Sequence, residues 1–271
     1  MAYTSKEEIA KWMTDSAVPA LHAVQGAGPS RSRLGGLPSL PLGQTWPHWK
    51  GKPLSYLAQL DFAEGAKMAM LPGFPKTGRA LFFYNQEQST WGFDPNDWGS
   101  WAVYYDGGVD ADATKDAFPE GLEKHGRFAE KPLSFRAIRS FPDYRSRISV
   151  DRKAVSDSDC EQLSALKSEV FCKHPQHQIG GFPSAVQNDA MELECQLVSN
   201  GVYCGDPSAA KDPRVGGLRA GAPDWILLFQ LDSDDDVGMM WGDVGMLYFW
   251  IRRQDLARRN FSSVWMILQC C

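Results

Sequence analysis

The chain has 271 residues and a net charge of −5, because 33 aspartates and glutamates outnumber 28 lysines and arginines. This mild acidity argues against a general nucleic-acid binder, which needs a basic surface to displace counterions from phosphates. Its apolar runs, such as residues 225–229, are too short to cross a membrane, while 10 tryptophans and 14 phenylalanines supply ample core for folding without metals or disulfides.

The six cysteines all lie in the second half of the chain, and their spacing does not suggest a disulfide framework. A secretory signal is not expected either, because Lys6, Glu7, Glu8 and Lys11 interrupt the first apolar residues. We therefore expect reduced thiols and a cytoplasmic location.

The first half of the chain begins with a predicted helix. Ser5 and Glu8 have the spacing of a capping box, and apolar residues then recur at helical spacing until Pro19, which is expected to end the helix. The Gly- and Pro-rich residues 26–45 predict a loop. Short runs of aromatic and branched residues, bounded by Gly, Pro or Asp, predict strands over residues 54–60, 79–84, 101–105 and 133–138.

The polar, basic stretch of residues 141–157 is the expected boundary between two halves, 1–150 and 151–271, of one compact unit. The second half opens with a predicted helix, because Ser158 and Glu161 again have capping-box spacing. A further helix is predicted over residues 188–199, where Gly201 supplies a left-handed stop. Strands are then predicted over residues 225–231, 245–251 and 264–269, with a short helix at 254–259 between the last two.

The two halves contain three similar blocks in the same order. Matching order over three blocks predicts an internal duplication, in which two copies of one β unit pair about a pseudo-twofold axis. The fold class is therefore α+β and β-rich, with two related antiparallel-sheet halves and a few peripheral helices. The blocks are LGGLP at 34–38 and IGGFP at 179–183, LAQLD at 57–61 and LFQLD at 228–232, and GRALFF at 78–83 and GMLYF at 245–249.

These blocks resemble the YwqG-like family, a bacterial domain of unknown function. The resemblance rests on residues 34–41 with the Trp46-Pro47 pair, on 57–61, 177–183 and 228–233, on MWGDVGMLYF at 240–249, and on 267–270. It implies a β-rich α+β fold with an internal duplication and brings no established activity or catalytic residues. Some members of the family lie near polymorphic-toxin genes, which implies an immunity role for part of the family.

The densest set of chemistry-bearing residues is acidic. Its spacing matches the first half of a calcium-binding loop, but Val237 stands where that loop needs Gly, its twelfth residue is Asp rather than Glu, and a strand leads into it. The pattern therefore favours an exposed acidic turn, and neither a metal nor another cofactor is expected. The set comprises Asp232, Asp234, Asp235, Asp236 and Asp243.

Trp241 lies inside the same acidic stretch. A tryptophan at this place either joins the core or stands beside the carboxylates as an anchor for a partner. Because solvated charges add little stability, replacing Asp234, Asp235 and Asp236 with Asn is expected to leave the fold intact.

Zinc ligation and nucleophilic catalysis have weaker signals. The motifs Gly-x-Ser-x-Gly, Walker A and Gly-x-Gly-x-x-Gly do not occur, so no catalytic residue is expected, although a pair of Cys172 with a distant histidine stays open. Without a CxxC pair, the candidate zinc ligands read better as ordinary core residues. They are Cys172, His174 and His177, with Cys160, Cys195 or Cys204 as a fourth.

Gln59 and Gln230 hold matching places in the two repeats, and each is followed two residues later by an aspartate, Asp61 or Asp232. Residues i and i+2 of a strand face the same side, so each pair projects together. If the repeats pair, the two sets converge on one polar centre flanked by Trp46 and Trp241. Such a centre is either a buried hydrogen-bond network or a binding site.

Two functions follow from these patterns. The first is a non-catalytic binding protein, most concretely an immunity-type protein that neutralises a basic toxin domain through the acidic stretch. The second is a small-molecule-binding protein or enzyme that uses the polar Gln/Asp centre between the repeats, with or without a metal. The missing catalytic motifs favour the first.

Overall fold

A single antiparallel sheet organises the chain in the computed structural model, which describes residues 2–26, 28–107, 117–150, 154–168 and 175–271. Its strand order is β11-β10-β9-β8-β1-β7-β2-β4-β5-β6, and β3 pairs with β4 beside this path. The strands are β1 (Val18–Gln25), β2 (Arg33–Leu34), β3 (His48–Trp49), β4 (Lys52–Asp61), β5 (Arg79–Asn85), β6 (Trp101–Asp106), β7 (Lys131–Ser140), β8 (Gln178–Ile179), β9 (Trp225–Asp232), β10 (Met246–Arg252) and β11 (Trp265–Gln269).

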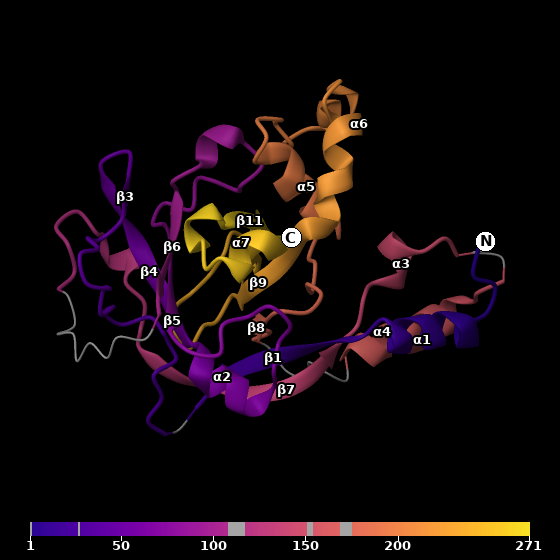
Figure 1. The fold of residues 1–271 in the computed structure, drawn as a ribbon, viewed down its shortest axis with the longest axis horizontal. Coiled ribbons are helices and arrows are strands. Elements are labelled where there is room, and N and C mark those ends of the chain that lie inside the picture. The colour runs from indigo at the N-terminus through magenta and orange to yellow at the C-terminus, as the bar shows by residue number, and fades with distance from the viewer. Residues whose placement is uncertain (1, 27, 108–116, 151–153, 169–174) are drawn as a thin grey trace.

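Short helices surround this sheet, and α1 and α4 lie side by side at one end of the molecule (Figure 1). No described helix has the length and apolarity that a bilayer crossing requires. The α-helices are α1 (Lys6–Asp15), α2 (Phe62–Met68), α3 (Tyr144–Arg147), α4 (Asp157–Ser168), α5 (Met191–Val198), α6 (Val215–Leu218) and α7 (Arg253–Ala257), and 3-10 turns span Pro95–Asp97, Lys124–Gly126, Pro207–Lys211, Arg219–Asp224 and Phe261–Ser263.

Aromatic side chains fill the inner face of the curved sheet. The ring of Phe82 on β5 lies 5.0 Å from that of Phe229 on β9 and 5.0 Å from that of Phe249 on β10. Because β5 is far from β9 and β10 in the strand order, these contacts require the sheet to curl back on itself, as Figure 1 shows. Tilted and edge-to-face ring pairs stabilise this core beyond the area that they bury.

The outermost strands, β6 and β11, meet through aromatic side chains. The rings of Trp101 and Trp265 are 4.9 Å apart, and Nε1 of Trp101 donates a hydrogen bond to the Val264 carbonyl at 2.8 Å. Tyr105 stacks on Phe261 with ring centroids 4.6 Å apart. This packing nearly closes the sheet and covers edges that would otherwise offer unpaired backbone groups to other chains.

A smaller core holds α1 against α4. Ile9 and Met13 of α1 are fully buried there together with Tyr144 and Leu163. Ser5 caps α1, since its side chain accepts a hydrogen bond from the backbone of the residue three positions later, as the capping-box spacing predicts.

The cap of α4 lies two residues earlier than predicted. Ser156 and Asp159 form the reciprocal capping pair. The backbone N–H of each residue donates to the side chain of the other at 3.1 Å. Ser158 and Glu161, which have the same spacing, already lie inside the helix. A three-residue spacing recurs in this polar segment, so the spacing alone does not identify the cap.

The predicted β-rich α+β class and the predicted strands are confirmed, each strand within a few residues of its expected ends. The sequence patterns do not predict β1, because they use Pro19 only as the end of the first helix. The N–H of Ala23 donates to the His177 carbonyl, on the side of β1 that faces β8. Backbone nitrogens of alternate residues face the same side of a strand, so the nitrogen of Pro19 also faces that side. Because β8 ends opposite Leu21, Pro19 lies beyond it, and its missing N–H breaks no hydrogen bond between the strands.

Candidate functional site: the Gln/Asp positions and the acidic turn

Gln59 is a buried member of a hydrogen-bond network on β4. Its Nε2 donates to the Arg31 carbonyl at 2.6 Å, and its Oε1 accepts from Nη1 of Arg79 at 3.2 Å. Arg79 is itself buried and pairs with Asp106, Nη2 to Oδ2, at 3.0 Å. Both ends of the Gln59 amide are therefore used to hold β4 against its neighbours.

Asp61 is the N-cap of α2, a helix that the sequence patterns did not predict. One oxygen of its carboxylate accepts hydrogen bonds from the N–H groups of Ala63 at 2.9 Å and Glu64 at 3.1 Å. The other oxygen pairs with Nε of Arg31 at 3.0 Å. A carboxylate at this position accepts hydrogen bonds from N–H groups that have no partner within the helix. Its negative charge also interacts favourably with the helix dipole.

Gln230 and Asp232 occupy the corresponding positions on β9 and are also buried. The Gln230 amide donates to the Gln176 carbonyl at 2.8 Å and accepts from the Ser184 N–H at 2.8 Å. Asp232 accepts from the Gln176 N–H at 2.7 Å. These groups therefore hold the segment around β8 against β9.

The prediction that the two Gln/Asp sets converge is wrong. Their strands, β4 and β9, are separated in the sheet by β8, β1, β7 and β2. Gln59 lies opposite Leu81, and Gln230 lies opposite Tyr248, so each projects from the face opposite to the core-facing Phe82 or Phe249. The two sets thus form separate networks on the outside of the curved sheet.

The tryptophans expected to flank a common centre also lie apart. Trp46 donates from Nε1 to the Leu54 carbonyl at 2.8 Å and packs edge to face on Phe83, with ring centroids 5.8 Å apart. Trp241 packs edge to face on Tyr84 and Phe128, at 6.2 Å and 5.6 Å. Each belongs to a different cluster of buried residues.

Each of the two separate networks contains one further hydrogen bond, and the two bonds occupy matching positions. The N–H of Asp61 donates to Oγ of Ser32 at 2.9 Å, and the N–H of Asp232 donates to Nδ1 of His177 at 3.1 Å. Ser32 and His177 stand at the same place, three residues before the first glycine of the Gly-Gly pair in their blocks. All four glycines of these pairs have positive φ, between 55° and 74°, as a turn at each pair requires.

The stretch that joins β9 to β10, residues 233–245, contains most of the predicted acidic set and is named the acidic turn here. Its backbone is anchored at both ends, because Asp234 and Met239 exchange hydrogen bonds at 2.8 and 3.0 Å, and the Gly245 N–H donates to the Trp241 carbonyl at 2.8 Å. The turn is therefore a defined structure.

Asp234 departs from the prediction of an exposed acidic residue. It is 5% exposed, and its carboxylate accepts hydrogen bonds from Nε2 of Gln25 at 3.1 and 3.3 Å and from the Asp236 N–H at 3.1 Å. Nε2 of His177 lies 3.2 Å away. Burial raises the pKa of the Asp234 carboxyl, but the hydrogen bonds from His177 and Gln25 outweigh it and hold that pKa below its ordinary value.

Three carboxylates of the acidic turn face solvent, those of Asp235, Asp236 and Asp243. Two apolar side chains are exposed among them, Met240 at 42% and Val244 at 59%. Val244 also has a φ of +50°, which is unusual for a branched residue. The turn thus presents negative charge and apolar area together.

Trp241 does not stand beside these carboxylates as an anchor. It is 1% exposed, and its Nε1 donates to the Asp232 carbonyl at 3.1 Å. Its ring packs in the main core and thereby anchors the acidic turn to the rest of the fold. The core role considered for it from the sequence is therefore the one that it has.

In the described ranges, no group of three or more His, Cys, Asp or Glu side chains is arranged to hold a metal ion. Two of the proposed calcium ligands, Asp232 and Asp234, accept hydrogen bonds from protein groups instead. Of the proposed zinc ligands, Cys172 and His174 lie outside the described residues.

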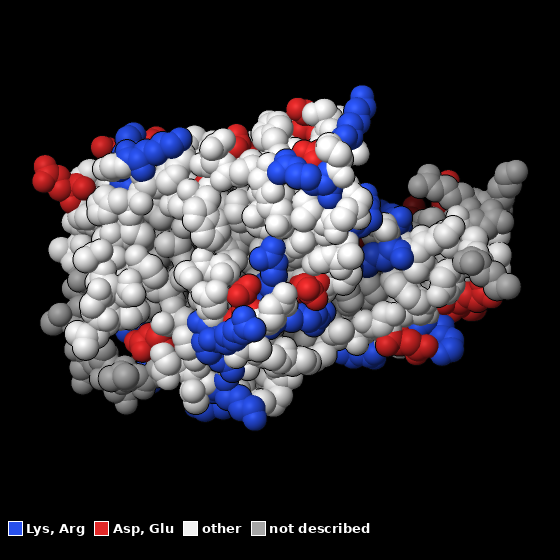
Figure 2. All heavy atoms as spheres, turned by 45° about the horizontal axis from the view of Figure 1, so that its top comes forward, with Lys and Arg blue, Asp and Glu red and all other residues white. Residues whose placement is uncertain are grey.

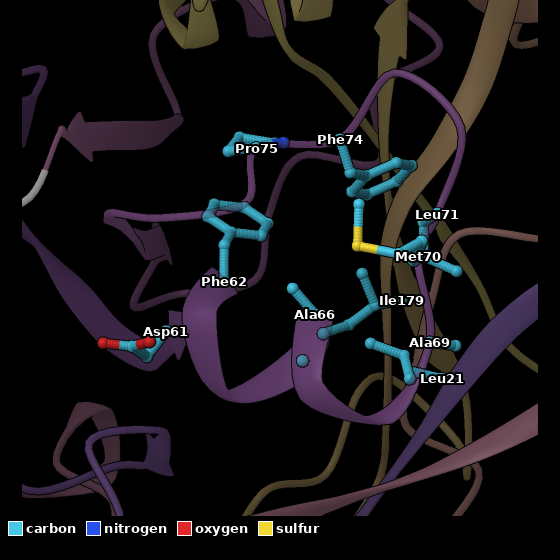
Figure 3. A pocket seen from close by; sticks show the side chains of 11 residues that line it. Leu21, Asp61, Phe62, Ala66, Ala69, Met70, Leu71, Phe74, Pro75 and Ile179 are labelled. Atoms are coloured by element: carbon cyan, nitrogen blue, oxygen red, sulfur yellow. The ribbon is translucent and has the colours of Figure 1, made fainter.

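A small apolar cavity lies between α2 and the loop that follows it (Figure 3). Its volume of about 20 Å³ has room for about one water molecule, which is too little for a substrate. The carboxylate of Asp61 points away from the apolar side chains in Figure 3. The walls include Leu21, Phe62, Leu71, Phe74 and Ile179.

Charge is mixed on the face drawn in Figure 2, where basic and acidic side chains alternate in small groups. A broad field of one sign is not present on that face. Along the chain, the acidic turn is a local concentration of negative charge, with four aspartates among residues 233–245.

Comparison with known families matches residues 32–270 to a family model described as Domain of unknown function (DUF1963). No curated protein matches the sequence. The match begins just before the LGGLP block and ends at residue 270, so it includes both Gln/Asp pairs and the acidic turn. The prediction of a domain of unknown function is confirmed.

Proposed function

Because the chain belongs to the family described as Domain of unknown function (DUF1963), we propose its function from its own site: it is a non-catalytic binding protein that holds a basic protein partner at the acidic turn. The observation that carries this proposal is the exposure of Asp235, Asp236 and Asp243 around Met240 and Val244 on an anchored backbone.

Rigid presentation favours binding because little conformational freedom is lost when the partner docks. Exposed carboxylates attract a basic surface and raise the association rate, while apolar side chains among them supply contact area. The buried Asp234 and Trp241 hold this surface in place without touching the partner.

The partner class that fits is a basic toxin domain, with the chain acting in the cytoplasm as an immunity-type protein. The acidic turn supports this proposal through charge complementarity. The alternative, an enzyme or small-molecule site built on Gln59, Asp61, Gln230 and Asp232, has less support, because these side chains lie on separate strands and are engaged in hydrogen bonds within the fold.

The test uses basic proteins encoded beside the gene for this chain. Each is purified, and its binding to the chain is measured by calorimetry at low and high salt. The triple variant Asp235→Asn, Asp236→Asn, Asp243→Asn should bind about tenfold or more weakly at low salt, with a smaller salt dependence. When this triple variant is coexpressed with a toxic partner, it should fail to protect the cells from that partner.

A control variant removes the same number of charges elsewhere. Glu7→Gln, Asp157→Asn and Glu161→Gln change exposed residues on or beside α1 and α4. This control should bind like the parent chain. Equal binding by the parent and the acidic-turn variant, with both folded, would rule out the acidic turn as the interface.

We further propose that the chain is a duplicated, YwqG-like protein whose halves, 1–150 and 151–271, descend from one β unit. The strand order supports this, because β2-β4-β5-β6 and β8-β9-β10-β11 run outward from the central β1–β7 pair in the same sequence. The matching hydrogen bonds of Ser32 with Asp61 and of His177 with Asp232 support it independently.

A further inference from the structure

A second cleft lies at the end of the sheet opposite to the acidic turn. It forms where β1 and β9 begin and where β8 and β10 end, and its volume is about 300 Å³. The acidic turn joins the other ends of β9 and β10. The cleft is therefore separate from the surface proposed above for a basic partner, and an inference about it does not depend on that proposal.

The walls of this cleft include four aromatic residues. Phe74 comes from the loop after α2, Phe182 follows β8, and Trp225 and Trp250 come from β9 and β10. Phe74 also borders the small cavity in Figure 3, so one loop separates the two spaces. A concave, mainly apolar space of this volume at the mouth of a curved sheet is typical of a small-molecule site.

Two polar groups in and beside the cleft wall have no partner in the described fold, and one of them is accessible. Trp250 is 1% exposed, and its Nε1 has no hydrogen-bond partner within the described ranges. Arg253 is exposed on the rim, and the described residues offer its guanidinium no ion pair. Because the Trp250 donor is enclosed by protein, the guanidinium of Arg253 is the group that a ligand in the cleft can reach.

The other cation of the cleft is already neutralised. Arg147 donates to Asp189 at 2.8 Å and to Glu192 at 2.6 Å, and its guanidinium lies 5.0 Å from the ring centre of Phe182. These contacts fix Arg147 in the wall. Among the described residues that line the cleft, Arg253 is then the cation available to a ligand.

We propose that this cleft binds a small carboxylate with an apolar, preferably aromatic, body. The carboxylate pairs with Arg253, and the body packs among the aromatic side chains of the wall, which include the ring of Trp250. Guanidinium–carboxylate pairing supplies orientation, and burial of the apolar body supplies most of the affinity.

The experiment uses 3-phenylpropanoate as the probe and neutral 3-phenylpropanamide as its comparison. Both are titrated into the full chain labelled with ¹⁵N-tryptophan, and the indole N–H signals are followed by NMR. The variant Trp250→Phe identifies the signal of Trp250 by its loss. Arg253→Met tests the charge, and Arg258→Met, an exposed arginine just beyond α7, is the matched control.

The carboxylate should shift the Trp250 signal in the parent chain and in Arg258→Met with the same dissociation constant. Arg253→Met should weaken carboxylate binding about tenfold and leave the weaker binding of the amide unchanged. The proposal is overturned by an unshifted Trp250 signal at saturating probe, or by equal carboxylate affinity in Arg253→Met and the parent chain. Because Arg253 is exposed, its variant tests the proposal even if Trp250→Phe does not fold.

Discussion

Nε2 of His177 lies 3.2 Å from a carboxylate oxygen of Asp234, and both side chains are almost entirely buried. Nδ1 of the same ring faces the Asp232 N–H at 3.1 Å, a group that can only donate, so Nδ1 must accept and Nε2 must carry the proton. The neutral ring therefore donates to Asp234. With both nitrogens used in this way, the His–Asp pair joins β8 to the acidic turn and does not serve as a free base.

Replacing Asp234 should therefore destabilise the protein far more than replacing its exposed neighbour. We expect Asp234→Asn to lower the free energy of unfolding by about 1–3 kcal/mol, because it removes an acceptor from buried donors. Asp235→Asn should change it by less than about 0.5 kcal/mol. Urea denaturation at neutral pH measures both, and equal values would contradict the role assigned to Asp234.

The pH dependence of that difference has a definite sign. The pKa of Asp234 is lower in the folded chain than its ordinary value, so its contribution is present at neutral pH and is lost as pH falls through that folded pKa. The free energy of unfolding of Asp234→Asn should converge on that of the parent chain in this acidic range. A gap that stays constant down to the acid transition would show that the ionised carboxylate is not what matters.

Glu194 should behave in the opposite way. Burial raises the pKa of its carboxyl from its ordinary value near 4.5 to about 7, and its Oε2 has no hydrogen-bond partner in the described ranges. Ionisation therefore costs stability as pH rises from about 4.5 to about 7. We expect Glu194→Gln to stabilise the chain at pH 8 by up to about 3 kcal/mol and to have little effect near pH 4.5.

Denaturation curves at several pH values test this, with the exposed Glu123→Gln as the control. The control should show no such trend. A stabilisation by Glu194→Gln that is the same at acidic and basic pH would contradict the burial argument.

The Gly-Gly turns should tolerate no side chain at Gly35. Its φ is +55°, and an added Cβ would lie 2.2 Å from the carbonyl oxygen of Ala129. Gly43 has a φ of +80° and open space around it, so it separates backbone strain from collision. We expect Gly43→Ala to cost about 1 kcal/mol of unfolding free energy and Gly35→Ala roughly 3 kcal/mol or more. Thermal unfolding compares them, and similar costs would argue against the close approach.

Trp241 should matter for stability because it is a core residue. We expect Trp241→Ala to cost about 3–5 kcal/mol, from the lost apolar burial and the cavity left behind. Met240→Ala, at the exposed neighbouring position, should cost less than about 0.5 kcal/mol. Denaturant midpoints measure this difference. A small effect of Trp241→Ala on stability would contradict the core role and favour the alternative, in which Trp241 is an anchor for a partner beside the aspartates.

Local patterns in the sequence determined most elements of the fold. Runs of aromatic and branched residues between turn residues mark β4, β5, β9 and β10, because their strand character depends on neighbours within a few positions. The cap at Ser5 and the left-handed turn at Gly201 follow in the same way from local backbone needs.

Only the tertiary structure decided which aspartates are exposed. Asp234 and Asp235 are neighbours of the same type, yet Asp234 is buried because Gln25, 209 residues away, and His177, 57 residues away, supply its hydrogen bonds. Period-two spacing showed that Gln59 and Asp61 share a face, but not whether that face looks toward the core. Which face is inside depends on how the sheet curls, and contacts between distant strands, such as Phe82 with Phe229, set that curl.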